Sequence, residues 1–241
     1  MKLTPPASAP RAEKRPQPDT HHGITRVDDY AWLRDENWRE VMRNPDALDR
    51  DIRAYLEAEN AYTEAALAPL AEFRETLFRE MKGRIKEDDS SVPSPDGPFA
   101  YFTRYLEGAQ HPLFCRRARD AESGETVLLN ANKEAEGEAY FKIGDVDHSP
   151  DHRLLAWSAD RKGSEYFSVR IRDLDTGKDL ADEVPDTSPG IAWDASGKSF
   201  LYTQVDDEHR PLKVFRHVVG TPASDDRLIY EEKDEGFFVG V

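Results

Sequence analysis

The chain has little cysteine and no long apolar segment. Cys115 is the single cysteine among its 241 residues, so no internal disulfide can form, and its place in a predicted strand indicates a packing role. No apolar run approaches the length of a transmembrane helix, and the N-terminus lacks the apolar region of a signal peptide. We therefore expect a cytoplasmic protein that has no membrane partner.

Sequence motifs of several enzyme classes are missing. None of the 14 glycines belongs to the Gly-x-Ser-x-Gly turn that carries the nucleophile of α/β-hydrolases, and no Gly-x-Gly-x-x-Gly nucleotide motif occurs. Residues 192–199 match the loosest form of a phosphate-binding loop, but a strand is predicted after them, where that motif requires a helix. We predict a hairpin turn there, and no catalytic or cofactor-binding residue in this chain.

Two pairs of histidines raise the question of a metal site. They are His21 with His22 and His148 with His152. Pro150 excludes a helical spacing for the second pair, and no cysteine or carboxylate cluster completes either pair in the sequence. The pattern therefore predicts solvent-exposed loop histidines, with no metal ligand and no cofactor.

Positive charge is scarce. The chain has 33 Lys and Arg against 48 Asp and Glu, which gives a formal net charge of -15. Nucleic acids and anionic membrane surfaces repel such a chain, so we expect neither as a partner. A basic peptide is attracted to it.

The N-terminal part of the chain has helical spacing. Residues 1–20 are rich in Pro and Ala and predict an extended arm, and residues 28–35 predict a docking segment. Apolar residues three and four apart then predict helices over 52–66 and 70–85. The period changes from 3.6 to 2 after Ile85, and the acidic residues that follow predict a solvated linker between two domains.

Beyond this point the chain repeats a sheet-like unit. Residues 146–180 contain a turn, an apolar run and an alternating run, which predicts a small antiparallel sheet. The same pattern recurs after a shift of 45 residues towards the C-terminus and a shift of 55 towards the N-terminus. Repeats of about 40 to 50 residues are typical of propeller blades. Residues 237–241 predict the opening strand of a fourth unit, as in a truncated chain.

Seven short motifs along the chain occur in the order in which a known peptidase family has them. The chain resembles the N-terminal part of the oligopeptidase B branch of the prolyl oligopeptidase family of serine peptidases. The motifs are residues 27–35, 53–60, 111–117, 163–166, 172–174, 206–211 and 236–241.

The resemblance implies an all-β propeller of seven blades inserted into an α/β-hydrolase domain. Residues 1–78 would belong with the hydrolase domain, and residues 79–241 would form blades one to three and the start of blade four. The catalytic triad, the oxyanion hole and the residues that hold a substrate Arg or Lys would all follow Val241. The chain alone is therefore expected to be inactive.

The function that the resemblance implies is hydrolysis of short basic peptides after Arg or Lys, with the propeller limiting access to the active site. Two alternatives remain open: a non-catalytic propeller that serves as a binding scaffold, and a relative with a different P1 preference. The expected partners are short basic peptides and the hydrolase domain. Expected interdomain packing residues are Tyr30, Trp32, Leu33, Arg34 and Asp35.

Overall fold

The protein forms two compact units. We describe it from a computed structural model, which describes residues 8–234 and 236–241. The units are Met1–Lys86 and Glu87–Val241. Their boundary lies beside Ile85, where the hydrophobic period changes. The boundary that the resemblance implies, between residues 78 and 79, falls inside the last helix of the first unit, and the assignment of that unit to a hydrolase domain stays a prediction.

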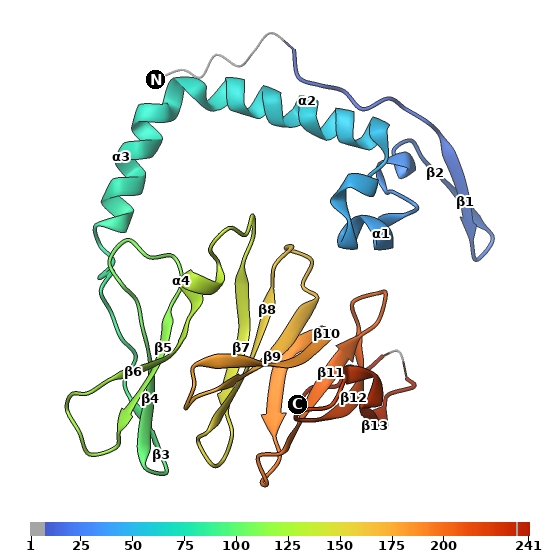
Figure 1. Ribbon diagram of the computed structural model, residues 1–241. Coiled ribbons are helices and arrows are strands. Elements are labelled where there is room, and N and C mark those ends of the chain that lie inside the picture. Colours follow the sequence, from blue (N-terminus) through green and yellow to red (C-terminus); the bar gives the residue numbers. More distant parts are fainter. Residues whose placement is uncertain (1–7, 235) are drawn as a thin grey trace. The chain divides into compact units, whose positions relative to one another are not determined.

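The first unit contains a β-hairpin and two long helices (Figure 1). Its elements are β1 (Gln17–His21), β2 (Ile24–Asp28), η1 (Ala31–Leu33), α1 (Trp38–Arg43), η2 (Pro45–Ala47), α2 (Arg50–Leu67), η3 (Ala68–Leu70) and α3 (Ala71–Lys82). Both long helices were predicted. The hairpin was not, because β1 begins inside the segment expected to be an extended arm. The positive φ angles of His22 and Gly23 close its two-residue turn.

Helix α2 has a capped N-terminus, whereas the apolar face of α3 is left open. The Asp49 carboxylate accepts hydrogen bonds from the backbone N–H groups at the start of α2, and Ile52 is buried in its first turn. On α3, Phe73, Leu77 and Met81 are 57%, 40% and 59% exposed. The first unit alone therefore does not cover the row of apolar side chains from which this helix was predicted. In the part of the chain that the structure describes, no helix is both long and apolar enough to cross a membrane.

The described residues of the second unit form antiparallel sheet, the short α-helix α4 and the 3-10 helix η4. Its elements are β3 (Ser94–Asp96), β4 (Phe99–Arg104), β5 (Leu113–Ala118), β6 (Thr126–Asn130), α4 (Ala131–Glu134), β7 (Lys142–His148), β8 (Leu154–Asp160), β9 (Phe167–Asp173), β10 (Lys178–Trp193), β11 (Ser199–Val205), β12 (Pro211–Val218), η4 (Ala223–Asp225) and β13 (Arg227–Glu231). One sheet has the order β3-β4-β5-β6, and the other runs from β7 to β13 in sequence order.

Strand β10 divides the larger sheet into two blades. Its first part pairs with β9 and its last part with β11, and the register shifts between Val184 and Thr187 and again between Thr187 and Ile191. Strands β7 to β10 thus form the second blade, and the end of β10 with β11 to β13 forms the third (Figure 1). The three predicted units are therefore present, each with four strands.

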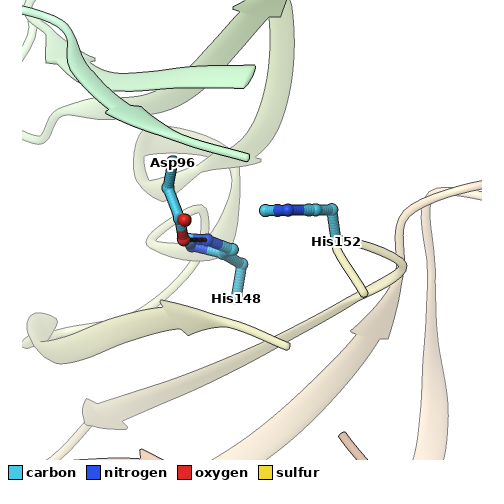
Figure 2. A group of neighbouring side chains, drawn as sticks. All are labelled: Asp96, His148 and His152. Atoms are coloured by element: carbon cyan, nitrogen blue, oxygen red, sulfur yellow. Dashed lines mark hydrogen bonds and ion pairs between the residues drawn. The ribbon is translucent and has the colours of Figure 1, made fainter. Parts of the chain in front are cut away.

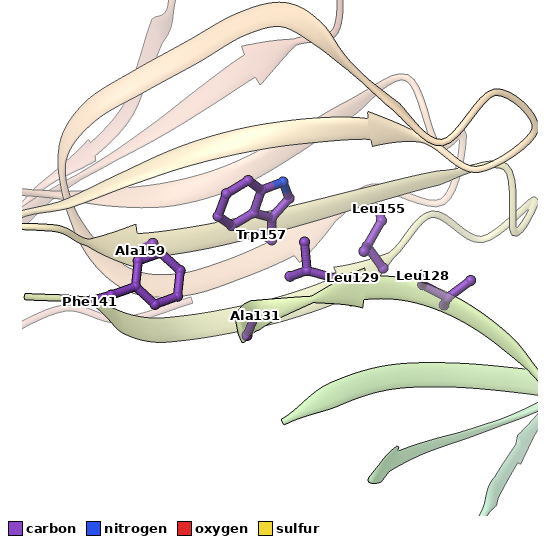
Figure 3. Packing of buried hydrophobic residues seen from close by; sticks show 7 residues of the cluster. All are labelled: Leu128, Leu129, Ala131, Phe141, Leu155, Trp157 and Ala159. Atoms are coloured by element: carbon purple, nitrogen blue, oxygen red, sulfur yellow. The ribbon is translucent and has the colours of Figure 1, made fainter. Parts of the chain in front are cut away.

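The blades pack face to face through apolar side chains (Figure 3). Leu128 and Leu129 of the first blade belong to one buried cluster with Leu155 and Trp157 of the second. Trp157 and Leu129 are fully buried. A second cluster, which includes Val169 and Phe200, joins the second and third blades. Burying these large side chains stabilises the unit by about 2 kcal/mol each.

Two sequence predictions need correction in the second unit. Among the acidic residues before β3, Asp88 and Asp89 are exposed and Glu87 is partly buried. The segment is attached to β4, because Ser91 and Asp89 exchange backbone hydrogen bonds with Thr103 and Tyr105. Residues 237–241 form no strand. The backbone N–H of Val239 bonds to the Pro211 carbonyl instead, and no neighbouring strand of a fourth blade is available for pairing among the described residues.

Candidate functional site

The predicted docking segment is attached to helix α2 of its own unit. The indole Nε1 of Trp32 donates a hydrogen bond to the Glu13 carbonyl at 2.9 Å, which holds the N-terminal arm. The Arg15 guanidinium lies 4.2 Å from the centre of the Trp32 ring, and Tyr55 of α2 meets the ring edge-on at 6.4 Å. Trp32 therefore joins the arm to α2 inside the first unit.

Asp35 organises the turns that follow. One carboxylate oxygen accepts from the backbone N–H of Asn37 at 2.7 Å, and the other accepts from that of Asp49 at 2.7 Å. Asn37 and Asp49 are the N-cap residues of α1 and α2. Asp35 therefore holds the N-termini of α1 and α2 together.

The remaining residues of the segment face outwards to different degrees. Tyr30 is 43% exposed, Arg34 is exposed and Leu33 is partly buried. Arg34 also lines a pocket within the first unit, together with Trp32 and Asp35. The volume of this concave surface is about 860 Å³. This surface is available for a partner, and its use for interdomain packing stays a prediction.

Equivalent turns occur in the three blades. The turn after Asp96 contains Gly97, and the repeat shifts place His152 and Gly197 at the same position. All three have positive φ, at 51°, 61° and 67°. The backbone bonds of the last two turns match as well, since His152 N–H bonds to Ser149 and Gly197 N–H to Asp194. A non-glycine residue costs about 1 kcal/mol in this conformation, so His152 occupies a strained position.

His152 and His148 belong to a side-chain cluster between the first two blades (Figure 2). His148 Nε2 donates to Asp96 Oδ2 at 2.8 Å, and this hydrogen bond lowers the pKa of the Asp96 carboxyl. His152 Nδ1 shares a hydrogen bond of 2.8 Å with the Tyr101 hydroxyl. The Tyr101 ring stacks on the His148 ring with 3.8 Å between the ring centres. Burial raises the pKa of the Tyr101 phenol.

The prediction of exposed loop histidines is wrong for this pair. Only 17% of the His148 side chain is exposed, and one ligand atom each of Asp96, His148 and His152 lies within 4.8 Å of the others. The carboxylate that the sequence pattern did not supply is that of Asp96, which lies in the equivalent turn one repeat earlier. The 55-residue shift aligns the two turns, so it was the signal that could have identified Asp96.

The other sequence candidates have structural roles. Residues 194–199 form the hairpin turn between β10 and β11, as predicted for the phosphate-loop match, with Asp194 N–H bonded to the Ser199 carbonyl at 2.9 Å. Cys115 is buried in β5, and burial raises the pKa of its thiol to about 11. The thiol is therefore protonated at neutral pH, as expected of a packing residue.

The chain is similar to several known peptidases. It is 39% identical to dipeptidyl aminopeptidase BI of Pseudoxanthomonas mexicana over 99% of its length, and 34% identical to protease 2 of Moraxella lacunata over 95%. These matches cover 34% and 32% of the two relatives, so the chain spans about a third of their length.

The chain is also similar to peptidases whose structures have been solved. Oligopeptidase B from Leishmania major matches 95% of the chain with a TM-score of 0.85 and 30% identity, and the match covers 33% of that protein. Oligopeptidase B from Trypanosoma brucei, solved in a closed form with covalently bound antipain, matches 94% with a TM-score of 0.83 and 30% identity, again over 33% of the protein. The family model for the prolyl oligopeptidase N-terminal β-propeller domain matches residues 10–241. The chain therefore belongs to the prolyl oligopeptidase family.

Proposed function

We propose that this chain is the propeller portion of a serine peptidase that hydrolyses short peptides after Arg or Lys. The observation that carries the proposal is the similarity to oligopeptidase B from Leishmania major, at 30% identity over 95% of the chain. The α/β-hydrolase domain that the sequence resemblance implies would supply the triad and the pocket for the basic side chain. The cytoplasmic location stays a prediction.

The first unit would pack on that hydrolase domain. Two features support this role: the uncovered apolar side chains Phe73, Leu77 and Met81 of α3, and the concave surface beside Trp32 and Arg34. An exposed apolar stripe on a helix is typical of an element that is covered by a further part of the protein.

The propeller would restrict the active site to short, flexible peptides. Its acidic charge would attract basic substrates, and the net charge of -15 supports this role. Loop 206–210 offers a test. The Asp206 carboxylate accepts from the backbone N–H groups of Glu208 and Arg210 and must be kept, whereas Asp207 is exposed. The substitution Asp207→Lys in the full-length protein should lower kcat/KM for basic peptides at low salt and less at high salt. An unchanged salt dependence would argue against attraction by this loop.

Activity is tested with the full-length protein, assayed on matched peptides that end in Arg, Lys, Pro or Leu before a reporter group. We expect turnover of the Arg and Lys peptides and none of the Pro and Leu peptides. An unfolded protein of several hundred residues should be cut much more slowly than a short peptide with the same site. Equal rates on the two would contradict a restriction by size.

The similarity to a dipeptidyl aminopeptidase favours a second candidate. Such an enzyme releases two residues from a free amino end, so it requires the substrate's ammonium group. Acetylation of that amine in a dipeptide substrate would abolish its turnover, whereas an endopeptidase would accept the acetylated form. A non-catalytic binding scaffold would hydrolyse neither form.

A further inference from the structure

The first two blades meet in a group of side chains that the peptidase function does not use. The group comprises Asp96 at the end of β3, His148 at the end of β7 and His152 in the turn after it, with Tyr101 of β4 beside them (Figure 2). Asp96 lies on the first blade and the histidines lie on the second. We propose that Asp96, His148 and His152 bind a zinc ion that bridges the two blades.

The donor set suits zinc. Two imidazole nitrogens and one carboxylate oxygen are ligands that zinc prefers, and water completes a tetrahedron where the protein supplies three ligands. Zinc holds such ligands at about 2 Å, so their atoms lie about 3.3 Å apart. The three ligand atoms lie within 4.8 Å of one another, and the two imidazole rings are stacked at an interplanar angle of 18°, so the rings must rotate to point at one ion.

Neighbouring contacts orient the two histidines. The Tyr101 hydroxyl holds His152 Nδ1 at 2.8 Å, and His152 Nε2 lies against Gly97, so the imidazole must turn before one of its nitrogens can face the ion. His148 Nε2 already faces the Asp96 carboxylate at 2.8 Å. Zinc would replace the proton between these two atoms, and that proton is released to solvent.

The backbone brings His152 to Asp96 in an unusual way. A Cβ at Gly97 would lie 2.4 Å from His152 Nε2, so only glycine leaves room for the ring beside the residue that follows Asp96. His152 itself has the positive φ that glycine has in the equivalent turns of the other blades. A strained residue kept at a cluster of ligand atoms is typical of a functional position. Asp96 has a 61% exposed side chain, so an ion can reach the group from solvent.

Zinc binding is tested on the full-length protein by competition with a chromophoric chelator. We expect one equivalent of zinc to bind, and Asp96→Asn, His148→Gln and His152→Asn each to weaken binding at least about tenfold. Asn tolerates the positive φ at position 152, so the last variant removes the ligand and not the turn. The matched control is His21→Gln, which alters an exposed histidine paired with Asp19 at 2.9 Å and should leave affinity unchanged.

Two further measurements need no variant. Cobalt in place of zinc should give the strong visible absorption of a tetrahedral site, and zinc should raise the melting temperature because it binds the folded protein only. Both effects should weaken in acid, because a protonated imidazole cannot bind zinc. The proposal is overturned if the wild type binds no stoichiometric zinc, if His152→Asn binds it as well as the wild type does, or if only His21→Gln weakens it. Peptidase activity plays no part in these measurements, so their outcome is independent of the proposed function.

Discussion

His217 lies between two buried carboxylates in the third blade. Its Nδ1 contacts Asp226 at 2.8 Å and its Nε2 contacts Asp182 at 3.1 Å, and none of the three side chains is more than 4% exposed. Each ring nitrogen therefore has one carboxylate oxygen within hydrogen-bond distance. These contacts offset the cost of burying the carboxylates.

We predict that His217→Leu lowers the free energy of unfolding by about 3–5 kcal/mol, because it removes a hydrogen-bond partner from each of two buried carboxylates. Urea denaturation followed by circular dichroism measures the change. The control is His21→Leu, at a side chain that is 77% exposed, with an expected change near zero. A loss no larger than that of the control would mean that the carboxylates find other partners.

Asp194 supplies a pH-dependent contribution to stability. Hydrogen bonds from Ser196 and Ser199 lower the pKa of its carboxyl to about 2, and Arg216 adds a favourable charge. Because the folded-state pKa lies below the usual 3.8, the stabilisation is complete above about pH 4 and is lost as the pH falls towards 2. The side chain is 32% exposed, so we expect only about 1 kcal/mol.

The substitution Asp194→Asn should therefore destabilise the protein by about 1 kcal/mol at pH 7 and by less as the pH falls below 4. Melting temperatures of the variant and the wild type across this range measure the difference. A gap that widens with acid would reverse the sign of the linkage and refute the assignment to this carboxylate.

At the scale of the element, β7 passes very close to the neighbouring strands. A Cβ at Gly144 would lie 2.5 Å from Ser158 Oγ and 2.7 Å from both Phe167 and Pro189. The approach lets Ser158 donate to the Pro189 carbonyl at 2.8 Å, which joins β8 to β10. Glycine is needed here for space, since its backbone angles are ordinary.

We predict that Gly144→Ala lowers the free energy of unfolding by about 1–3 kcal/mol through overpacking. Gly240→Ala is the matched control, because a Cβ there would meet no atom within 4 Å. Chemical denaturation of the two variants compares them directly. Equal stabilities would show that the strands move apart without cost.

At the scale of the whole molecule, apolar side chains remain uncovered at the end of the third blade. Leu228, Ile229 and Tyr230 on β13 are 43–49% exposed, and Phe237 and Phe238 are 62% and 67% exposed. Strand β13 is also an edge of its sheet. An apolar edge without a cover favours association between copies.

We therefore predict that the 241-residue chain self-associates with rising concentration. Sedimentation velocity at several concentrations measures this. Replacing Phe237 and Phe238 by Ser should weaken the association of the chain. A monomer at every concentration would contradict the prediction.

Much of the fold could be predicted, because its signals are local. The repeat shifts identified the three blades, and the turn at residues 194–199 was recognised as a hairpin. The extent of β10 could not be predicted: Pro189 and Gly190 lie inside it, and such residues usually end a strand. Here they lie near the bulge before Ile191, where the strand passes from one blade to the next.

The side-chain cluster between the blades was missed because its ligands are far apart in the sequence. Asp96 is 52 residues before His148. Pro150 excludes a helix between His148 and His152, so a search for metal ligands at helical spacing rejects this pair. The cluster instead depends on two turns at equivalent positions of adjacent blades. The docking segment, by contrast, is local, and the structure explains its Trp32 and Asp35 within the first unit.

The continuity of β10 affects how the described blades can separate. One strand is shared by the second and third blades, so a force that separates these blades must shear the hydrogen bonds of both at once. The first and second blades share no strand, and α4 with the loop after it connects them. Mechanical opening would therefore begin at the junction that contains Asp96 and His148, and an ion bound there would stiffen the weakest junction of the described blades.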